Sequence, residues 1–173
     1  MASLERFRQK LNAAQAVFCG TADPISPEQW AHQPGPQQWS AAEVVAHLVV
    51  VERAIVEKAG SIIQKAPLPV PFSKKWHLPV RLAEMRVSRV KSPLPQDPSL
   101  LGEKEAMLAT LRGARERTIA FLAETEHRDL SAYYWKHPFI GMLSVYEWME
   151  MIAAHQLRHA KQVREIHRKL SRK

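Results

Sequence analysis

Apolar residues recur every three or four positions along most of this chain, and this spacing restricts it to a helical fold. In residues 3–19 the apolar positions are Leu4, Phe7, Leu11, Ala14 and Phe18. Such spacing places apolar side chains on one face of a helix. Similar patterns predict further helices over residues 40–64, 101–126 and 144–170. We find no sustained alternation with a period of two and no Asn-Gly or Asp-Gly turn, so β-strands have little support.

Prolines gather in the segments between these helices. Residues 20–39 contain four prolines, and we expect a loop there with one helical turn after Ser26. Residues 66–100 form a longer proline-rich connection that contains one short helical candidate, at about 80–90. Residues 127–142 are expected to be irregular. The chain therefore consists of four long helices joined by connectors of very different lengths.

The number of helices and the length of one connector indicate the fold class. A long connector allows consecutive helices to run parallel, and with residues 66–100 as that crossover we predict an all-α four-helix bundle. A chain of 173 residues suits a single domain, residues 1–173. Two helix starts carry the S-x-x-E capping box, in which each side chain satisfies a backbone donor of the first turn. These boxes are Ser40 with Glu43 and Ser144 with Glu147.

The composition is that of an ordinary globular protein. Hydrophobic residues make up 46% of the chain and charged residues 24%, which excludes a disordered or fibrous protein. No apolar run approaches the roughly 20 residues needed to cross a bilayer, and the N-terminal residues lack the apolar block of a signal peptide. The single cysteine, Cys19, excludes a disulfide framework and is expected to be a small buried hydrophobe. We therefore expect a cytoplasmic protein with no membrane partner.

The formal net charge of +8 raises the question of an anionic partner. Lys and Arg are spread along all the predicted helices, with a denser tail at residues 158–173. This tail ends a helix, where cations offset the negative pole of the backbone dipole. No strip of interleaved aromatic residues accompanies the charge. We therefore favour a solvated basic surface, or attraction to anionic small molecules, over nucleic-acid binding.

Three histidines on the predicted helices are candidate metal ligands. His155 and His159 are four residues apart, so they project from one helix face, in the middle of its apolar stripe. His47 lies on the apolar face of the second helix. Buried neutral imidazoles need hydrogen-bond partners or a metal, and bundles build metal sites from facing helices. We predict that these three residues hold one divalent transition metal, with one or more positions left to water.

The alternative for these histidines is an ordinary core role, in which each ring bonds to a separate protein acceptor. His47 taken by itself fits that role, because a lone histidine on an apolar face is usually a satisfied core residue. Other chemistries have less support. Residues 124–127 form the only E-x-x-H, whereas a di-iron carboxylate bundle needs one on each of two helices. No H-E-x-x-H, G-x-S-x-G or phosphate-binding glycine loop is present.

Several short motifs together resemble those of the DinB-like superfamily. They are W-S-A-A-E-V-V-A-H-L at 39–48, H-P-F-I-G at 137–141, Glu147-Trp148, and H-x-x-x-H-A-x-Q at 155–162. The resemblance spans residues 39–166 and implies a four-helix bundle with a long crossover, often as a homodimer. It also implies a metal, zinc or nickel among others, held by one histidine of the second helix and the HxxxH of the last. Those ligands correspond here to His47, His155 and His159.

The resemblance also implies a class of activity. Members of that superfamily include thiol S-transferases and isomerases that use low-molecular-weight thiols, and others described as hydrolases. We therefore expect a metal-dependent enzyme whose three-His site activates a water or such a thiol against a small-molecule substrate. The alternative is a non-catalytic, metal-stabilised bundle of the stress response that acts through its surface. We expect Glu52, one turn beyond His47, and Gln162 to orient the imidazoles.

Overall fold

The computed structural model describes residues 4–67, 69, 79–84 and 97–172. Its four long helices are α1 (Leu4–Ala22), α3 (Ala41–Ile63), α4 (Lys104–Glu124) and α5 (Val145–Leu170). Its short elements are α2 (Pro27–Trp30), the 3-10 helices η2 (Val80–Glu84), η3 (Pro98–Leu100) and η4 (Leu130–Ala132), and the strands β1 (Tyr134–His137) and β2 (Gly141–Ser144). All four predicted long helices are present, with ends shifted by a few residues.

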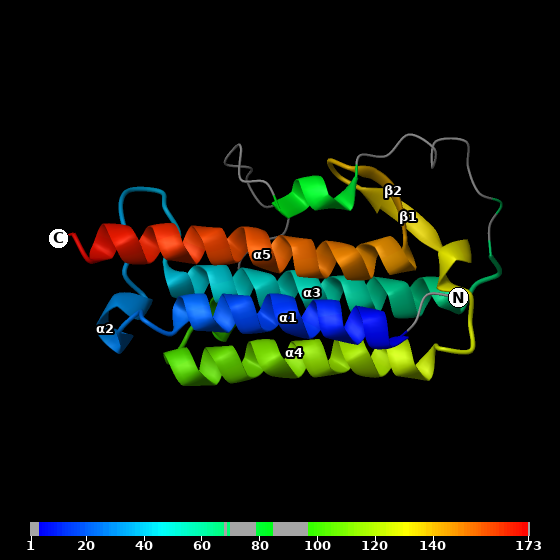
Figure 1. The fold of residues 1–173 in the computed structure, drawn as a ribbon, viewed down its shortest axis with the longest axis horizontal. Coiled ribbons are helices and arrows are strands. Elements are labelled where there is room, and N and C mark those ends of the chain that lie inside the picture. Colours follow the sequence, from blue (N-terminus) through cyan, green and yellow to red (C-terminus); the bar gives the residue numbers. More distant parts are fainter. Residues whose placement is uncertain (1–3, 68, 70–78, 85–96, 173) are drawn as a thin grey trace.

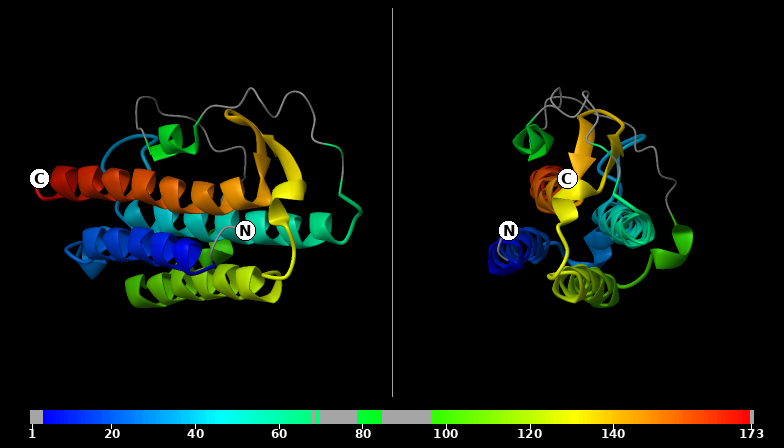
Figure 2. Two further views of the ribbon diagram at one scale, coloured as in Figure 1. Left: turned by 45° about the vertical axis from the view of Figure 1, so that its right-hand side comes forward. Right: turned by 90° about the vertical axis from the view of Figure 1, so that its right-hand side faces the viewer.

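The four long helices form a bundle of two parallel pairs (Figure 1). Helices α1 and α5 lie side by side and run in one direction, while α3 and α4 lie side by side and run in the opposite direction. Figure 2 shows the bundle end-on, where α5 also borders α3 and α1 also borders α4. Helix α3 ends at one end of the bundle and α4 begins at the other, so the connection from α3 to α4 has to span the length of the bundle. The predicted four-helix bundle with a long crossover is therefore confirmed.

Both capping boxes predicted from the sequence are formed. At the start of α3, Glu43 N donates to Ser40 Oγ at 3.2 Å and Ser40 N donates to Glu43 Oε2 at 2.6 Å. Ser144 and Glu147 repeat the arrangement at the start of α5. These boxes fix where α3 and α5 begin, and so fix the height of each later side chain along the bundle. The turn expected after Ser26 is also present as α2.

The prediction that residues 127–142 are irregular was wrong, because this stretch contains the turn η4 and most of an antiparallel hairpin. Strand β1 pairs with β2 from Tyr134 opposite Ser144 to His137 opposite Gly141. The strands do not alternate between buried and exposed positions, so the pattern sought in the sequence is missing. The connection is also unusual: His137 Nδ1 accepts hydrogen bonds from the backbone N–H groups of Phe139 and Ile140. Gly141 adopts a φ of 113°, which glycine tolerates.

The crossover is described only in part. Of the helical candidate at residues 80–90, the first half is present as η2, and residues 85–90 lie outside the described residues. Helix η2 lies on α5, where Lys161 Nζ donates to the carbonyl oxygen of Glu84 at 3.1 Å. The described part of the crossover, η2, therefore covers the middle of α5, the helix that carries two of the three candidate histidines.

The core consists of two hydrophobic clusters, one toward each end of the bundle. Cys19 is partly buried against one of them, as expected of a small hydrophobe, and burial raises the pKa of its thiol. Trp30 is buried in the core, and the rings of Trp135 and Trp148 stack with their centroids 4.6 Å apart. In the described part of the chain, no helix is both long enough and apolar enough to cross a membrane.

Candidate metal centre

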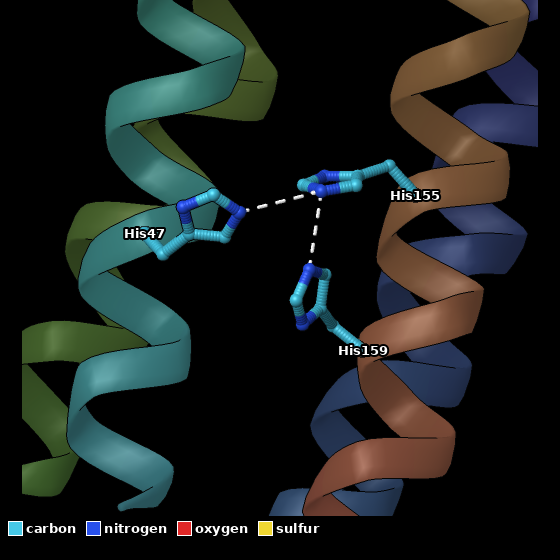
Figure 3. Close-up of side chains that lie close together, drawn as sticks. All are labelled: His47, His155 and His159. Atoms are coloured by element: carbon cyan, nitrogen blue, oxygen red, sulfur yellow. Dashed lines mark hydrogen bonds between the residues drawn. The ribbon is translucent and has the colours of Figure 1, made fainter. Parts of the chain in front are cut away.

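Three imidazole rings from two helices meet between α3 and α5 (Figure 3). His47 projects from α3, and His155 and His159 project from α5. The Nε2 atom of His155 lies 3.3 Å from His47 Nε2 and 3.1 Å from His159 Nε2. One ring nitrogen of each residue lies within 4.8 Å of the other two. The structure thus brings together the three residues that the sequence predicted, while metal binding itself stays a prediction.

Helix geometry and burial explain this convergence. His155 and His159 lie one turn apart on the face of α5 that also buries Ile152 and Val163. His47 lies on the strongly apolar α3, among residues that are almost all buried. Only 6% of the surface of His47 and of His159 is exposed, and His155 is partly buried. The three rings therefore form an interior cluster that opens to solvent mainly at His155.

Burial keeps the three rings neutral. It lowers the pKa of His47 to about 4 and that of His155 to about 3, because desolvation disfavours the imidazolium form. The charges of His47, Arg158 and His137 lower the pKa of His155 further. The pKa of His159 falls well below its usual value, mainly by desolvation and then by the two neighbouring imidazoles. The nitrogen lone pairs are therefore available at neutral pH.

Two residues outside the cluster fix the positions of its rings. Gln162 Oε1 lies 2.9 Å from His159 Nδ1, which therefore carries the proton and leaves the lone pair on Nε2. This contact agrees with the expectation for Gln162. The indole of Trp39 lies against two of the rings, at centroid distances of 5.0 Å from His47 and 6.3 Å from His159. Trp39 therefore forms part of the wall of the site.

The carboxylate of Glu52, the other expected orienting residue, faces α4 and forms a buried ion pair. Its Oε1 accepts from Arg115 Nε at 2.8 Å and from Thr118 Oγ1 at 2.7 Å, and its Oε2 accepts from Arg115 Nη2 at 3.1 Å. The guanidinium also donates to Gln156 Oε1 at 2.8 Å and to the carbonyl oxygen of Leu11. Arg115, on α4, thus contacts each of the other three long helices.

Arg115 was not predicted from the sequence as a functional or structural residue. Its side chain is only 1% exposed, which is rare for an arginine. A signal was available, since Arg115 falls within the apolar stripe of its helix, among the buried Leu111, Thr118 and Leu122. A charge in such a stripe requires a buried partner, and Glu52 occupies a similar position in the apolar face of α3. A pairing of Arg115 with Glu52, two charged residues that each lie in the apolar face of a helix, was therefore predictable in principle.

The three-nitrogen cluster fits a divalent transition metal. Imidazole nitrogens bind zinc at about 2.0–2.1 Å, so two of them at a tetrahedral angle are separated by roughly 3.3 Å. The two Nε2 separations of 3.1 and 3.3 Å have this value. Neutral imidazoles suit zinc, nickel, copper and iron. The donor set therefore matches the ion that the resemblance implied, without distinguishing among these metals.

Comparison with known proteins identifies the family. A model of the DinB superfamily matches residues 10–163, and the chain belongs to that superfamily. The chain is 26% identical over 151 residues to the uncharacterized protein YuaE of Bacillus subtilis (strain 168), covering 86% of this chain and 89% of YuaE.

Two solved structures share the fold. YfiT from Bacillus subtilis, described as a probable metal-dependent hydrolase with an unusual four-helix bundle topology, aligns with a TM-score of 0.62 and 15% identity, covering 99% of this chain and 92% of YfiT. The four-helix bundle protein TT2238 aligns with a TM-score of 0.59 and 19% identity, covering 94% of this chain and 99% of TT2238. At these identities the two structures support the four-helix bundle and its topology.

Proposed function

We propose that this protein is a divalent-metal-dependent enzyme whose centre consists of His47, His155 and His159. The observation that carries the proposal is the meeting of three ring nitrogens from two helices. Two of their separations, 3.3 and 3.1 Å, equal the spacing of metal ligands, and His47 and His155 are 108 residues apart in sequence. Membership of the DinB superfamily supports it. The description of YfiT as a probable metal-dependent hydrolase supports the same class of reaction.

Each residue of the centre has a definite task in this proposal. His47, His155 and His159 supply lone pairs without first losing a proton, because burial already keeps them neutral. Gln162 holds the proton of His159 on Nδ1. Trp39 covers two of the rings and excludes water from that side. When bound, a divalent ion supplies Lewis-acid chemistry that lowers the pKa of a water or thiol toward neutrality.

The substrate is proposed to be a small electrophile, attacked by water in a hydrolase or by a low-molecular-weight thiol in an S-transferase. The net charge of +8 favours an anionic thiol or substrate, because a positive protein raises the local concentration of anions. Zinc or nickel is the proposed metal. We also propose a homodimer, which sedimentation equilibrium tests directly.

A second candidate function has one observation in its favour. Two of the three histidines expose only 6% of their surface, which is typical of a structural metal site with little access for substrate. In that case the ion would stabilise the bundle, and the protein would act through its surface. The two functions differ in turnover but share the same ligands.

The test begins with metal analysis of protein purified without a histidine tag. We expect about one equivalent of zinc or nickel in the wild type and none in His159→Ala, with His127→Ala, an exposed histidine outside the cluster, as the matched control. Turnover of esters, amides or thiol–electrophile pairs that depends on the metal supports the enzyme. Stoichiometric metal without turnover supports the structural role. Full occupancy in His159→Ala contradicts the centre itself.

A further inference from the structure

A small cavity borders the histidine cluster at His155, between α3 and α5. It has a volume of about 10 Å³ and is lined by Leu48, Val51, Glu52, Ile152, His155 and Gln156. Three of these residues are aliphatic and three carry polar groups. A cavity of this size is close to the minimum that holds one water, and a buried water typically makes about three hydrogen bonds.

The side-chain amide NH2 group of Gln156 points away from Arg115, its hydrogen-bond partner. Its side chain is 1% exposed, and its Oε1 accepts from Arg115 Nη2 at 2.8 Å. Because a guanidinium can only donate, the amide oxygen must face Arg115 and the NH2 group must face the other way. Among the described residues, Gln156 Nε2 has no hydrogen-bond partner. A buried donor of this kind needs an acceptor close by.

A metal-bound His155 also requires an acceptor for a proton on its Nδ1. Its Nε2 faces the other two histidines, so its Nδ1 lies on the opposite part of the ring. When Nε2 keeps its lone pair for a metal, Nδ1 carries the proton and needs an acceptor, as Nδ1 of His159 finds in Gln162. The two hydrogen-bonding contacts of His155 with described residues are both at Nε2. His155 is one of the residues that line the cavity.

Glu52 supplies the negative charge beside this cavity. Its Oε1 already accepts two hydrogen bonds, from Arg115 and Thr118, whereas its Oε2 accepts one, from Arg115. A carboxylate oxygen can accept more than one hydrogen bond, so Oε2 can still receive one from the cavity. Two donors and one acceptor thus surround a space of the size of one water molecule.

We propose that one buried water occupies this cavity and connects the Glu52–Arg115 ion pair to the metal ligand His155. The water accepts hydrogen bonds from His155 Nδ1 and Gln156 Nε2 and donates one to Glu52 Oε2. Glu52 and Gln156 are then positioning residues that hold the ring of His155 and make it a stronger ligand. This inference rests on the proposed metal centre, because it assigns the tautomer that a ligating His155 needs.

A steric variant tests the water without altering any polar group. Val51→Ile adds one methylene to the wall of the cavity and should expel the water, while Val50→Ile makes the same change at a neighbouring position that does not line the cavity. Loss of an outer partner of a metal-bound histidine typically weakens metal binding 10–100-fold. We expect that loss of Co(II) affinity in Val51→Ile and less than about a threefold change in Val50→Ile.

Two further readouts separate positioning from simple stability. In the proton NMR spectrum of the Co(II) protein, the shifted N–H signal of His155 should exchange faster with solvent in Val51→Ile, while that of His159 stays unchanged. The role of the Glu52 carboxylate charge is tested by Glu52→Gln. This variant should bind Co(II) about tenfold more weakly even where it stays folded. Unchanged Co(II) affinity and unchanged exchange in Val51→Ile would overturn the proposal.

A high-resolution crystal structure of the metal-free wild type shows whether a water occupies the cavity, independently of metal binding and activity. We expect density for one water at about 3 Å from Gln156 Nε2 and from Glu52 Oε2. An empty cavity overturns the inference even if the protein binds metal and is active. Conversely, a wild type that takes up no metal defeats the proposed function, whether or not the water is present.

Discussion

His47 Nε2 lies 3.3 Å from His155 Nε2, although 108 residues separate the two histidines along the chain. This contact exists only because α3 and α5 are adjacent in the bundle and because each helix begins at a fixed residue. The two capping boxes set those starting points, and the helical repeat then places His47 and His155 at the same height. The site is therefore a direct product of the bundle topology.

The low pKa values of the histidines predict an unusual pH dependence of metal binding. Three ordinary imidazoles with a pKa near 6.5 would lose well over tenfold in metal affinity between pH 8 and pH 6, because protons compete for the nitrogens. In this cluster the pKa of His47 is about 4 and that of His155 about 3, so protons compete only at lower pH. We expect a less than threefold change over that range, measured by chelator competition. A tenfold decrease would contradict the burial of the cluster.

The same pKa values predict that acid destabilises the metal-free protein. The folded state holds these histidines with a pKa below the unfolded value of about 6.5, so the unfolded state binds more protons as pH falls. The stability that these neutral histidines contribute is therefore complete above about pH 7. It is lost as the pH falls below about 6.5, down to about pH 4 for His47 and about pH 3 for His155. Proton uptake by His47 in the unfolded state should alone lower the free energy of unfolding by about 2 kcal/mol between pH 7 and pH 5. Urea denaturation of the metal-free protein at several pH values measures this free energy. We expect it to depend less steeply on pH in the His47→Gln variant.

Removal of one partner of the buried ion pair should strongly destabilise the fold. Arg115→Met leaves Glu52 charged and buried with Thr118 as its remaining described donor, and we expect a loss of about 3–5 kcal/mol in the free energy of unfolding. Arg117→Met on the exposed side of the same helix should change it by less than about 0.5 kcal/mol. The double variant Glu52→Leu with Arg115→Met should recover much of the loss. Additive losses in the double variant would show that the pair is not the cause.

Gln162 offers a matched pair of substitutions at the metal centre. Gln162→Glu keeps an acceptor for the Nδ1 proton of His159, whereas Gln162→Leu removes it at similar volume. We expect Gln162→Leu to weaken metal binding by at least about tenfold and Gln162→Glu to retain it. Titration with Co(II), followed by its visible absorption, measures both affinities. Equal affinities in the two variants would mean that Gln162 does not orient His159.

The parts of the structure that follow local rules were predictable from the sequence. Periodicity identified the long helices, S-x-x-E identified two of their starts, and the i, i+4 spacing placed His155 beside His159. The hairpin was missed because its turn depends on the side chain of His137, and no residue pattern examined in the sequence describes such a turn. The network of Arg115 was missed because it requires knowing which helices are neighbours, a property of the tertiary arrangement.

X-ray absorption spectroscopy of the zinc-loaded protein tests the metal centre most directly, because it counts the imidazoles around the ion. We expect one equivalent of zinc with three histidine nitrogens at about 2.0 Å in the wild type, and two histidine nitrogens or loss of the metal in His47→Ala. An unchanged zinc environment in His47→Ala, or sulfur ligands from Cys19 in the wild type, would contradict a centre shared by α3 and α5.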